Sequence, residues 1–563
     1  MIATGQRVAP RAARFARALL PDVAYLPLAL VAAWSLVALA GFPHTHDGVG
    51  LERIESYRRA YLAGDFFPAW TALASNGHGS PHLLLYHRLH AQLFGLLSLA
   101  VGSVVAAKAA VVLLLAFGGA GMRRLCVMHG VRRWLAWVAG ALLLASNYAD
   151  VDWYVRGAIA ELTAFMLVPW CIGALIGVVD RNESPLRLGI WSALLFYGHM
   201  VVSMFFGFLV LSVLAERLSR ARELGWEGLR RLARQMLLAG AAAALCVLPF
   251  AAAVSYVQPL CGINDFGIEA DKTYPFSEYL FDPNVSWLGQ VTTDRITVEI
   301  GRYIVVPLVA LLVCSSAARA AVRARVWRLF VPALCFLLVQ PHDLLFVFDL
   351  LPGISKVQFP WRLMVYIVPI AVLTLAVALE WTLRAGAPLW NGVGAGAAIV
   401  VVACQILVTV RAQRDAKSKS YSTADLVPYL SDIETTATWG GFIPGGGRRL
   451  PKTPFVVASP GCTFSSPDLT GGRAVVEKMA PTHFKLLRLT VHGTGCSLKL
   501  NQYGSPLLEL TGSSPVHLRT DSDGLMVVDA PQDQTVVSIR ARGILELAER
   551  GVMQRVATAA AAD

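Results

Sequence analysis

The stretch from His44 to His90 alternates ionisable groups with aromatic rings. Connectors between apolar segments are usually short, and long polar ones are more often functional. Asp47 is the candidate catalytic residue, because a carboxylate held at a membrane surface can accept a proton from a hydroxyl group. Taken alone, Asp47 is more simply explained as a helix cap, but the neighbouring histidines favour a functional role. Candidate substrate-binding residues in this stretch are His44, His46, Glu52, His78, His82, Tyr86 and Arg88.

The run His44-Thr45-His46-Asp47 leaves metal binding open. Histidine and aspartate bind divalent metals, but this run has the spacing of no dedicated zinc motif. The nine cysteines form no CxxC pair. We therefore expect no certain cofactor and assign no metal ligand, while a divalent metal near Asp47 stays an alternative.

Two further polar groups lie beyond this stretch. Asp152, Arg156 and Glu161 form the first, where Arg156 could bind phosphate or could pair internally with either carboxylate. The second group consists of Lys356, Gln358, Trp361 and Arg362. Its cations would bind a lipid phosphate, or the group would be an interfacial belt of Trp and basic anchors. His199, between two apolar runs, is a candidate substrate-binding residue or a packing residue.

Composition indicates a polytopic α-helical membrane protein, since 56% of the 563 residues are hydrophobic and only 15% are charged. The net charge of +12 could suggest nucleic acid, but the arginines cluster at the ends of apolar runs. The positive-inside rule then gives a cytoplasmic N-terminus and an outward-facing stretch 43–102 with interfacial helices, one of them over Leu51–Ala63. We expect about eleven spans within 1–410, at 22–42, 103–122, 134–148, 161–179, 186–199, 200–216, 235–257, 302–318, 328–340, 361–382 and 389–410.

The composition changes after Val410. A linker over 411–450 leads into a β-rich domain over 451–545, followed by a tail over 546–563 that includes part of a short helix. Seven short alternating runs bounded by turn residues predict a β-sandwich or jelly roll. Cys462 and Cys496 are the cysteines of this domain, and an oxidising compartment would allow a disulfide between them.

A set of motifs occurs in this order along the chain: His46-Asp47, Glu52-Arg53, GDFFPAW (64–70), NGHGSP (76–81), WYVRGAIAELTAF (153–165), GHMVVS (198–203) and QFPWR (358–362). Together they resemble the bacterial membrane family described as "6-pyruvoyl-tetrahydropterin synthase-related", which is itself similar to GT-C glycosyltransferases. The resemblance covers roughly residues 20–410 and implies an inner-membrane protein with a periplasmic C-terminal domain. It also implies use of sugars carried on polyprenyl phosphate, with the acid of the first outer loop, here Asp47, as base.

Two hypotheses of function follow. In the first, a membrane glycosyltransferase moves a sugar from a polyprenyl-phosphate donor to an envelope glycan or lipid acceptor, while Arg156, Arg362 and Lys356 stabilise the departing phosphate. In the second, the chain is a non-catalytic scaffold or translocation component of envelope polysaccharide assembly. A secondary transporter is a weaker third, because the charges lie at the outer ends of the spans and no internal repeat is evident.

Overall fold

The chain divides into two compact units, each described here by itself. The helical unit comprises 1–46, 108–241 and 267–420, and the mixed unit comprises 47–107, 242–266 and 421–563. The computed structural model describes residues 21–43, 45, 49–72, 79–257, 274–282, 298–341, 344, 346, 359–385, 403, 420–421, 456–467, 475–476, 486–503, 505, 507–522 and 525–560.

The helical unit is built around α11 (Ile159–Arg181) and α20 (Met364–Ala385), whose side chains are almost all buried. Charged residues of α11 occur only near its ends, and Asn182 ends the helix in the left-handed conformation, with φ of 55°. Two short turns precede these helices, the π-helix η1 (Val151–Arg156) before α11 and the 3-10 turn η6 (Pro360–Leu363) before α20.

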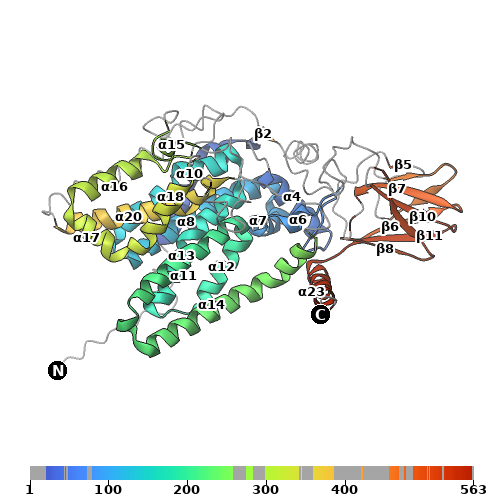
Figure 1. Ribbon diagram of the computed structural model, residues 1–563. Helices are drawn as coiled ribbons and strands as arrows, with labels where there is room; N and C mark the ends of the chain where they lie inside the picture. Colours follow the sequence, from blue (N-terminus) through green and yellow to red (C-terminus); the bar gives the residue numbers. More distant parts are fainter. Residues whose placement is uncertain are drawn as a thin grey trace, which may run out of the picture. The chain divides into compact units, whose positions relative to one another are not determined.

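Helices from the rest of this unit pack against both members of that pair (Figure 1). α8 begins in the mixed unit and α14 ends there, and β2 (Ser420–Tyr421) lies at the division. The elements are α2 (Tyr25–Ala32), α3 (Trp34–Ala38), β1 (Phe42–Pro43), α8 (Ser103–Met128), α9 (Arg133–Leu144), α10 (Asn147–Asp150), α12 (Pro185–Gly198), α13 (Met200–Ser219), α14 (Ala221–Val257), α15 (Phe276–Leu280), α16 (Arg302–Cys314), α17 (Ser316–Arg325) and α18 (Trp327–Val339).

Within the described residues, five helices are long and apolar enough to cross a membrane, so the chain is a multi-pass membrane protein. They are α8, α11, α13, α14 and η6 with α20. The predicted count of about eleven is not confirmed. α9, α12 and α18 have 12 to 14 residues, about 20 Å at about 1.5 Å per residue, which is short of a hydrocarbon core of about 30 Å. The predicted span 389–410 lies almost entirely outside the described residues.

Two predicted spans are broken. The run 22–42 is divided into α2 and α3 at Ala33. The run 302–318 turns by 108° at Ser315, and the described residues contain a sixth span only if α16 and α17 are counted as one. Ser315 caps α17 by accepting a hydrogen bond from the Ala318 amide at 3.1 Å. Because α17 carries Arg319, Arg323 and Arg325, its sequence cannot continue an apolar span.

In the mixed unit, α4 (Val49–Leu62) packs against α7 (Leu89–Val101), with α6 (His82–Leu85) beside them. α4 confirms the helix predicted over Leu51–Ala63, and it buries Leu51, Ile54 and Tyr57. A Cβ atom at Gly95 would lie 2.6 Å from Cβ of Tyr57, so this glycine lets the two helices approach closely. With 13 residues, α7 is too short to cross a membrane alone.

The C-terminal part of the mixed unit is a β-sandwich of two antiparallel sheets (Figure 1). One sheet has the order β5-β3-β7-β10-β9 and the other the order β4-β6-β11-β8. All seven predicted strands are present, and the jelly-roll alternative is not confirmed. The strands are β3 (Val456–Ala458), β4 (Thr463–Ser465), β5 (Val475–Val476), β6 (Leu486–His492), β7 (Cys496–Tyr503), β8 (Leu508–Gly512), β9 (His517–Thr520), β10 (Leu525–Ala530) and β11 (Thr535–Ala541).

The predicted disulfide between Cys462 and Cys496 is confirmed, with Cα atoms 5.9 Å apart. Cys496 opens β7 in one sheet and Cys462 immediately precedes β4 in the other, so the bond joins the two layers. The predicted terminal helix is α23 (Ile544–Ala560).

The first long loop is attached to the sandwich through β7. Trp70 is buried, and its indole Nε1 donates to Oε1 of Gln502 at 3.2 Å. Gln502 in turn donates from Nε2 to the carbonyl of Ala72 at 3.4 Å. Gly79 closes the contact with φ of +82°, where a Cβ atom would lie 2.3 Å from the Trp70 ring. The loop thus depends on a buried amide of the C-terminal domain.

We expect Gln502→Met to destabilise the protein, because the Trp70 indole and the Ala72 carbonyl would lose a buried partner. Each buried polar group left unpaired costs about 1–3 kcal/mol, so the thermal unfolding midpoint of the purified protein should fall by several degrees. The matched control is Lys499→Met on the same strand, which removes a half-exposed ion pair with Asp521 and should change little. Equal midpoints for the two variants would refute this role of Gln502.

Candidate functional site

In the mixed unit, two buried arginines lie on aromatic rings. The guanidinium carbon of Arg53, on α4, is 3.2 Å from the ring centroid of Tyr86. Arg88, just before α7, lies 5.9 Å from the ring centroid of Tyr57 and 5.3 Å from that of Phe250. Arg53 is only 5% exposed and Arg88 only 3%. We call Arg53, Tyr57, Tyr86, Arg88 and His90 the arginine–aromatic cluster.

Neither arginine of the cluster has a carboxylate within 4.0 Å among the described residues. Arg88 has a neutral partner, since the Gln92 amide, turned with its oxygen toward the guanidinium, accepts from Nη2 at 3.2 Å and from Nε at 3.3 Å. Removing a cation from water without a counter-charge costs several kcal/mol. The cluster is therefore suited to bind an anion, and a guanidinium binds phosphate well because its planar fork matches two oxygens.

His90 contributes a neutral imidazole to the cluster. It is 1% exposed, and neither ring nitrogen has a hydrogen-bond partner in the part of the chain that the structure describes. Burial, together with the nearby charge of Arg53, lowers the pKa of His90 to about 3. At neutral pH its ring can therefore donate one hydrogen bond and accept another without adding charge.

The helical unit holds a separate set of charges at the start of α11, which we call the charged network. Arg156 Nη1 lies 3.1 Å from Oδ1 of Asp152 and 3.0 Å from Oε1 of Glu161. Glu161 Oε2 lies 3.4 Å from Nε of Arg362, and Tyr148 donates its hydroxyl hydrogen bond to Oε1 of Glu161. All five residues are buried or nearly so. Glu161 therefore holds two arginines side by side.

Local backbone geometry builds this network. The π-helix η1 carries Asp152 and Arg156 four residues apart and ends at Gly157, whose φ is +73°. A Cβ atom at Gly157 would lie 2.1 Å from Oγ1 of Thr45, so only glycine allows this approach. π-helical turns are rare and occur often at functional sites. Through Thr45, the segment preceding α4 packs against the residue that follows Arg156.

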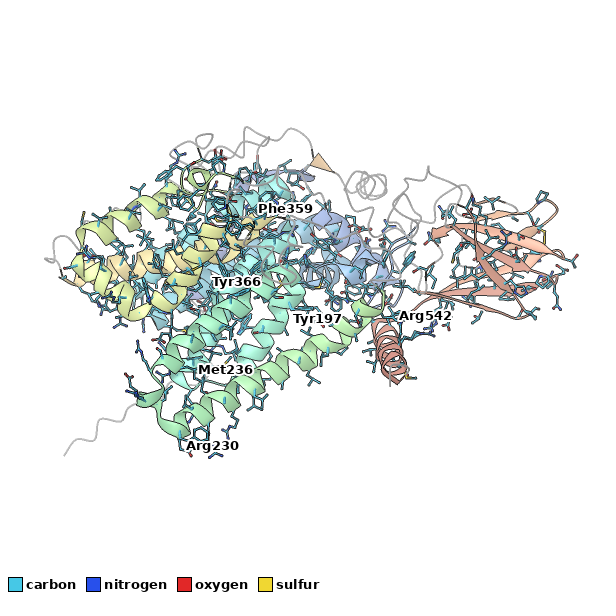
Figure 2. The ribbon with its side chains drawn as sticks, in the orientation of Figure 1. Tyr197, Arg230, Met236, Phe359, Tyr366 and Arg542 are labelled. Carbon is cyan, nitrogen blue, oxygen red and sulfur yellow. A yellow bond between two sulfur atoms is a disulfide. The ribbon has the colours of Figure 1, made fainter. Side chains whose placement is uncertain are left out.

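Aromatic residues at η6 pack against the two arginines of the charged network. The rings of Phe359 and Trp361 stack with centroids 4.6 Å apart, and the guanidinium carbon of Arg362 lies 4.9 Å from the Phe359 centroid. Figure 2 shows Phe359 near the beginning of α20, with Tyr366 further along this helix. Trp361 is 1% exposed, so it is a packed residue and not part of an exposed interfacial belt.

Several residues predicted to bind substrate lie outside both the arginine–aromatic cluster and the charged network. His199 is buried and caps α13, because its Nδ1 accepts from the Val202 amide at 3.3 Å. Glu52 is buried and accepts from the Ser56 hydroxyl at 2.9 Å. His82 lies in α6. Outside the described residues lie His44, His46, Asp47, His78, Lys356 and Gln358.

The described residues contain no group of three or more His, Cys, Asp or Glu side chains that could hold a metal ion. Because Asp47 lies outside these residues, a metal near it stays a prediction. Sequence reasoning missed Arg53, His90 and Tyr148 as site residues. Helical spacing gave no signal for Arg53, since it is two positions after Leu51 and one before Ile54 and so lies off the face that these two share.

No model of a protein family and no curated protein sequence matches this chain. Membership in the family that the motifs resemble thus stays a prediction. Among solved structures, arabinofuranosyltransferase AftD from Mycobacteria is similar, with 14% identity, a TM-score of 0.47 and coverage of 92% of this chain and 40% of its own. The chain thus spans two fifths of that structure's length.

Two further solved structures are also similar. ArnT from Cupriavidus metallidurans, bound to undecaprenyl phosphate, has 16% identity and a TM-score of 0.41, over 74% of this chain and 79% of its own. The oligosaccharyltransferase of Archaeoglobus fulgidus has 12% identity and a TM-score of 0.37, over 78% of this chain and 60% of its own. At these values the likeness carries no argument about activity, and the function proposed below depends on the residues of this chain.

We expect Glu161→Gln to destabilise the helical unit strongly, because Arg362 would lose its carboxylate and Arg156 would keep only Asp152. Breaking a buried ion pair costs about 3–5 kcal/mol, so the thermal unfolding midpoint of purified protein should drop by several degrees. The control is Glu183→Gln, which breaks a half-exposed pair with Arg187 beyond the other end of the same helix and should cost about 0–1 kcal/mol. A network without structural importance would give equal midpoints.

Proposed function

We propose that this chain is a GT-C-type glycosyltransferase that moves a sugar from a polyprenyl-phosphate donor to a hydroxyl of an envelope glycan or lipid. The observation that carries the proposal is the pair of buried guanidinium groups, Arg53 and Arg88, with no carboxylate contact among the described residues. A membrane protein that buries two such cations has a site for an anion within reach of lipid. A lipid-linked phosphate combines both requirements.

The contrast with the charged network assigns different roles to the arginines. Arg156 already contacts two carboxylates, so its charge is offset without a ligand. We therefore propose Arg53 and Arg88 as the main phosphate-binding residues and Arg156 as a positioning residue for η1. Arg362 belongs to the helical unit, where among described residues its contact with a carboxylate is a single one, at 3.4 Å; the phosphate-binding role predicted for it from the sequence stays a prediction for that unit by itself.

The reaction assigned to this site is an inverting transfer. Asp47 removes the proton of the acceptor hydroxyl, the oxygen attacks the anomeric carbon, and the bond from that carbon to the phosphate oxygen breaks. The polyprenyl phosphate leaves with the bonding electron pair, and Arg53 and Arg88 stabilise the negative charge that develops on it. Asp47 precedes α4 by two residues and belongs to the same unit as both arginines. The proposed site faces the periplasm.

We expect Arg53→Gln and Arg88→Gln each to weaken binding of polyprenyl phosphate by about ten- to a hundredfold, because a charge-assisted hydrogen bond contributes about 1.5–3 kcal/mol. Binding is measured as the rise of the unfolding midpoint with added lipid, and turnover as release of polyprenyl phosphate over a panel of lipid-linked sugars. The control is Arg59→Gln on the same helix, where Glu55 already pairs with the guanidinium at 2.7 Å.

The outcomes separate the hypotheses. Binding that depends on Arg53 and Arg88, with turnover of one donor, supports the transferase. Binding by the wild-type protein without turnover of any donor would favour the scaffold or translocation component instead. Equal loss in all three variants would mean that the cluster acts only through folding, which would remove the phosphate assignment.

We expect Asp47→Asn to abolish transfer while leaving expression, the unfolding midpoint and polyprenyl-phosphate binding unchanged, because the amide keeps the size of the side chain but cannot accept the proton. Turnover is followed in the same assay with and without a chelator, which also tests the predicted metal near Asp47. Full activity of this variant would exclude Asp47 as the base.

A further inference from the structure

The C-terminal half of α14 is apolar and largely uncovered. Its run from Met236 to Val257 contains no charged residue and, at about 1.5 Å per residue, extends about 33 Å, close to the roughly 30 Å of a hydrocarbon core. Leu245 and Leu248 are 78% and 61% exposed. Figure 2 shows Arg230 and Met236 toward the N-terminal end of this helix. The apolar run therefore ends at Val257, at a membrane boundary.

The terminal helix α23 packs against that boundary. A Cβ atom at Gly551 would lie 2.6 Å from the carbonyl oxygen of Ala252 and 3.1 Å from Cβ of Tyr256, so the two helices are in close contact there. Ile544, Leu547 and Ala548 are buried on the same side of α23 as Gly551, at the spacing of one helix face. This contact fixes α23 beside the last turns of the apolar run.

A second apolar edge of α23 is uncovered. Leu545 and Val552 are 75% and 54% exposed, and their separation of seven residues puts them on one side of the helix. Met553 is 66% exposed and lines a cavity of about 630 Å³ together with Tyr256 and three charged side chains. These three charged residues are Glu546, Glu549 and Arg550. The apolar edge of Leu545 and Val552 thus lies next to a charged side of α23, a separation of apolar and charged residues that is found in helices at a membrane surface.

We propose that α23 lies in the interfacial layer of the membrane, with Leu545 and Val552 inserted among the lipids. The lipid surface is the partner because the exposed edge belongs to a helix docked on the final turns of a membrane-crossing segment. The charged residues limit insertion to headgroup depth, where water still reaches their side chains. The helix anchors the β-sandwich to the bilayer, since only Arg542 and Gly543 separate α23 from β11.

The test uses the full-length protein in lipid nanodiscs. A dansyl-bearing amino acid replaces Leu545 or Val552, which leaves the native cysteines in place. Its emission is quenched either by spin-labelled phosphatidylcholine in the bilayer or by iodide in water. The matched control replaces Leu518, a leucine on β9 that is 43% exposed. Both test positions are exposed, so the substituted proteins should fold.

We expect the lipid-bound quencher to reduce emission at Leu545 and Val552 at least about twofold more than at Leu518, with the opposite order for iodide. Quenching by iodide alone at both test positions would overturn the proposal. Shielding from both quenchers that increases with protein concentration would also overturn it, in favour of a second copy of this chain. Loss of glycosyl transfer in the Asp47→Asn variant is independent of all these outcomes.

Discussion

The cost of burying a charge in apolar surroundings governs the arrangement of this protein. In the helical unit, two buried or nearly buried carboxylates next to apolar helices each contact two arginines. Asp22 contacts both Arg123 and Arg124, and Glu380, fully buried, contacts Arg132 and Arg384. Each pair offsets a desolvation penalty of several kcal/mol per ion. A fully buried cation without a carboxylate partner therefore needs a physical reason.

Arg53 and Arg88 are two such cations, since neither has a carboxylate partner in the part of the chain that the structure describes. The same helix α4 shows how a paired arginine is arranged, because Glu55 contacts Arg59 at 2.7 Å and Arg58 at 3.6 Å. Aromatic faces stabilise the guanidinium groups of Arg53 and Arg88 in part, since a desolvated cation–π contact contributes about 2 kcal/mol. That contribution is smaller than the penalty, and an incoming phosphate would supply the remainder. The desolvation penalty that lowers the stability of the ligand-free protein would then be offset when an anion binds, which increases the affinity for that anion.

Much of the fold could be predicted because its signals are local. Alternation of apolar and polar residues predicted all seven strands, whereas β4 and β5 were missed because three and two residues are too few to show a period. Hydropathy located the apolar segments but not their breaks. A bend such as that at Ser315 depends on a cap and on the arginines that follow it. The span count, which assumes that each apolar run is one straight helix, was therefore not confirmed.

The site was harder to predict, because pairing between distant residues decides which charges are offset. The sequence left Arg156 open between phosphate binding and internal pairing, and the two carboxylates at 3.0 and 3.1 Å favour the pairing. Trp361 matched the pattern of an interfacial anchor, yet its burial depends on Phe359 and on Tyr274 from another segment.

The β-sandwich has a structural connection to the first long loop that composition could not reveal. Trp70 and Gln502 are 432 residues apart in sequence, and neither shows by itself that it has a distant partner. Their buried hydrogen bond means that the ends of the segment 73–78, which contains His78, are held by β7. A domain that looks separable by composition thus makes a buried contact with the residues on both sides of this segment, Trp70 and Ala72 before it and Gly79 after it. Deleting the sandwich would therefore remove the partner of these residues as well as the domain itself.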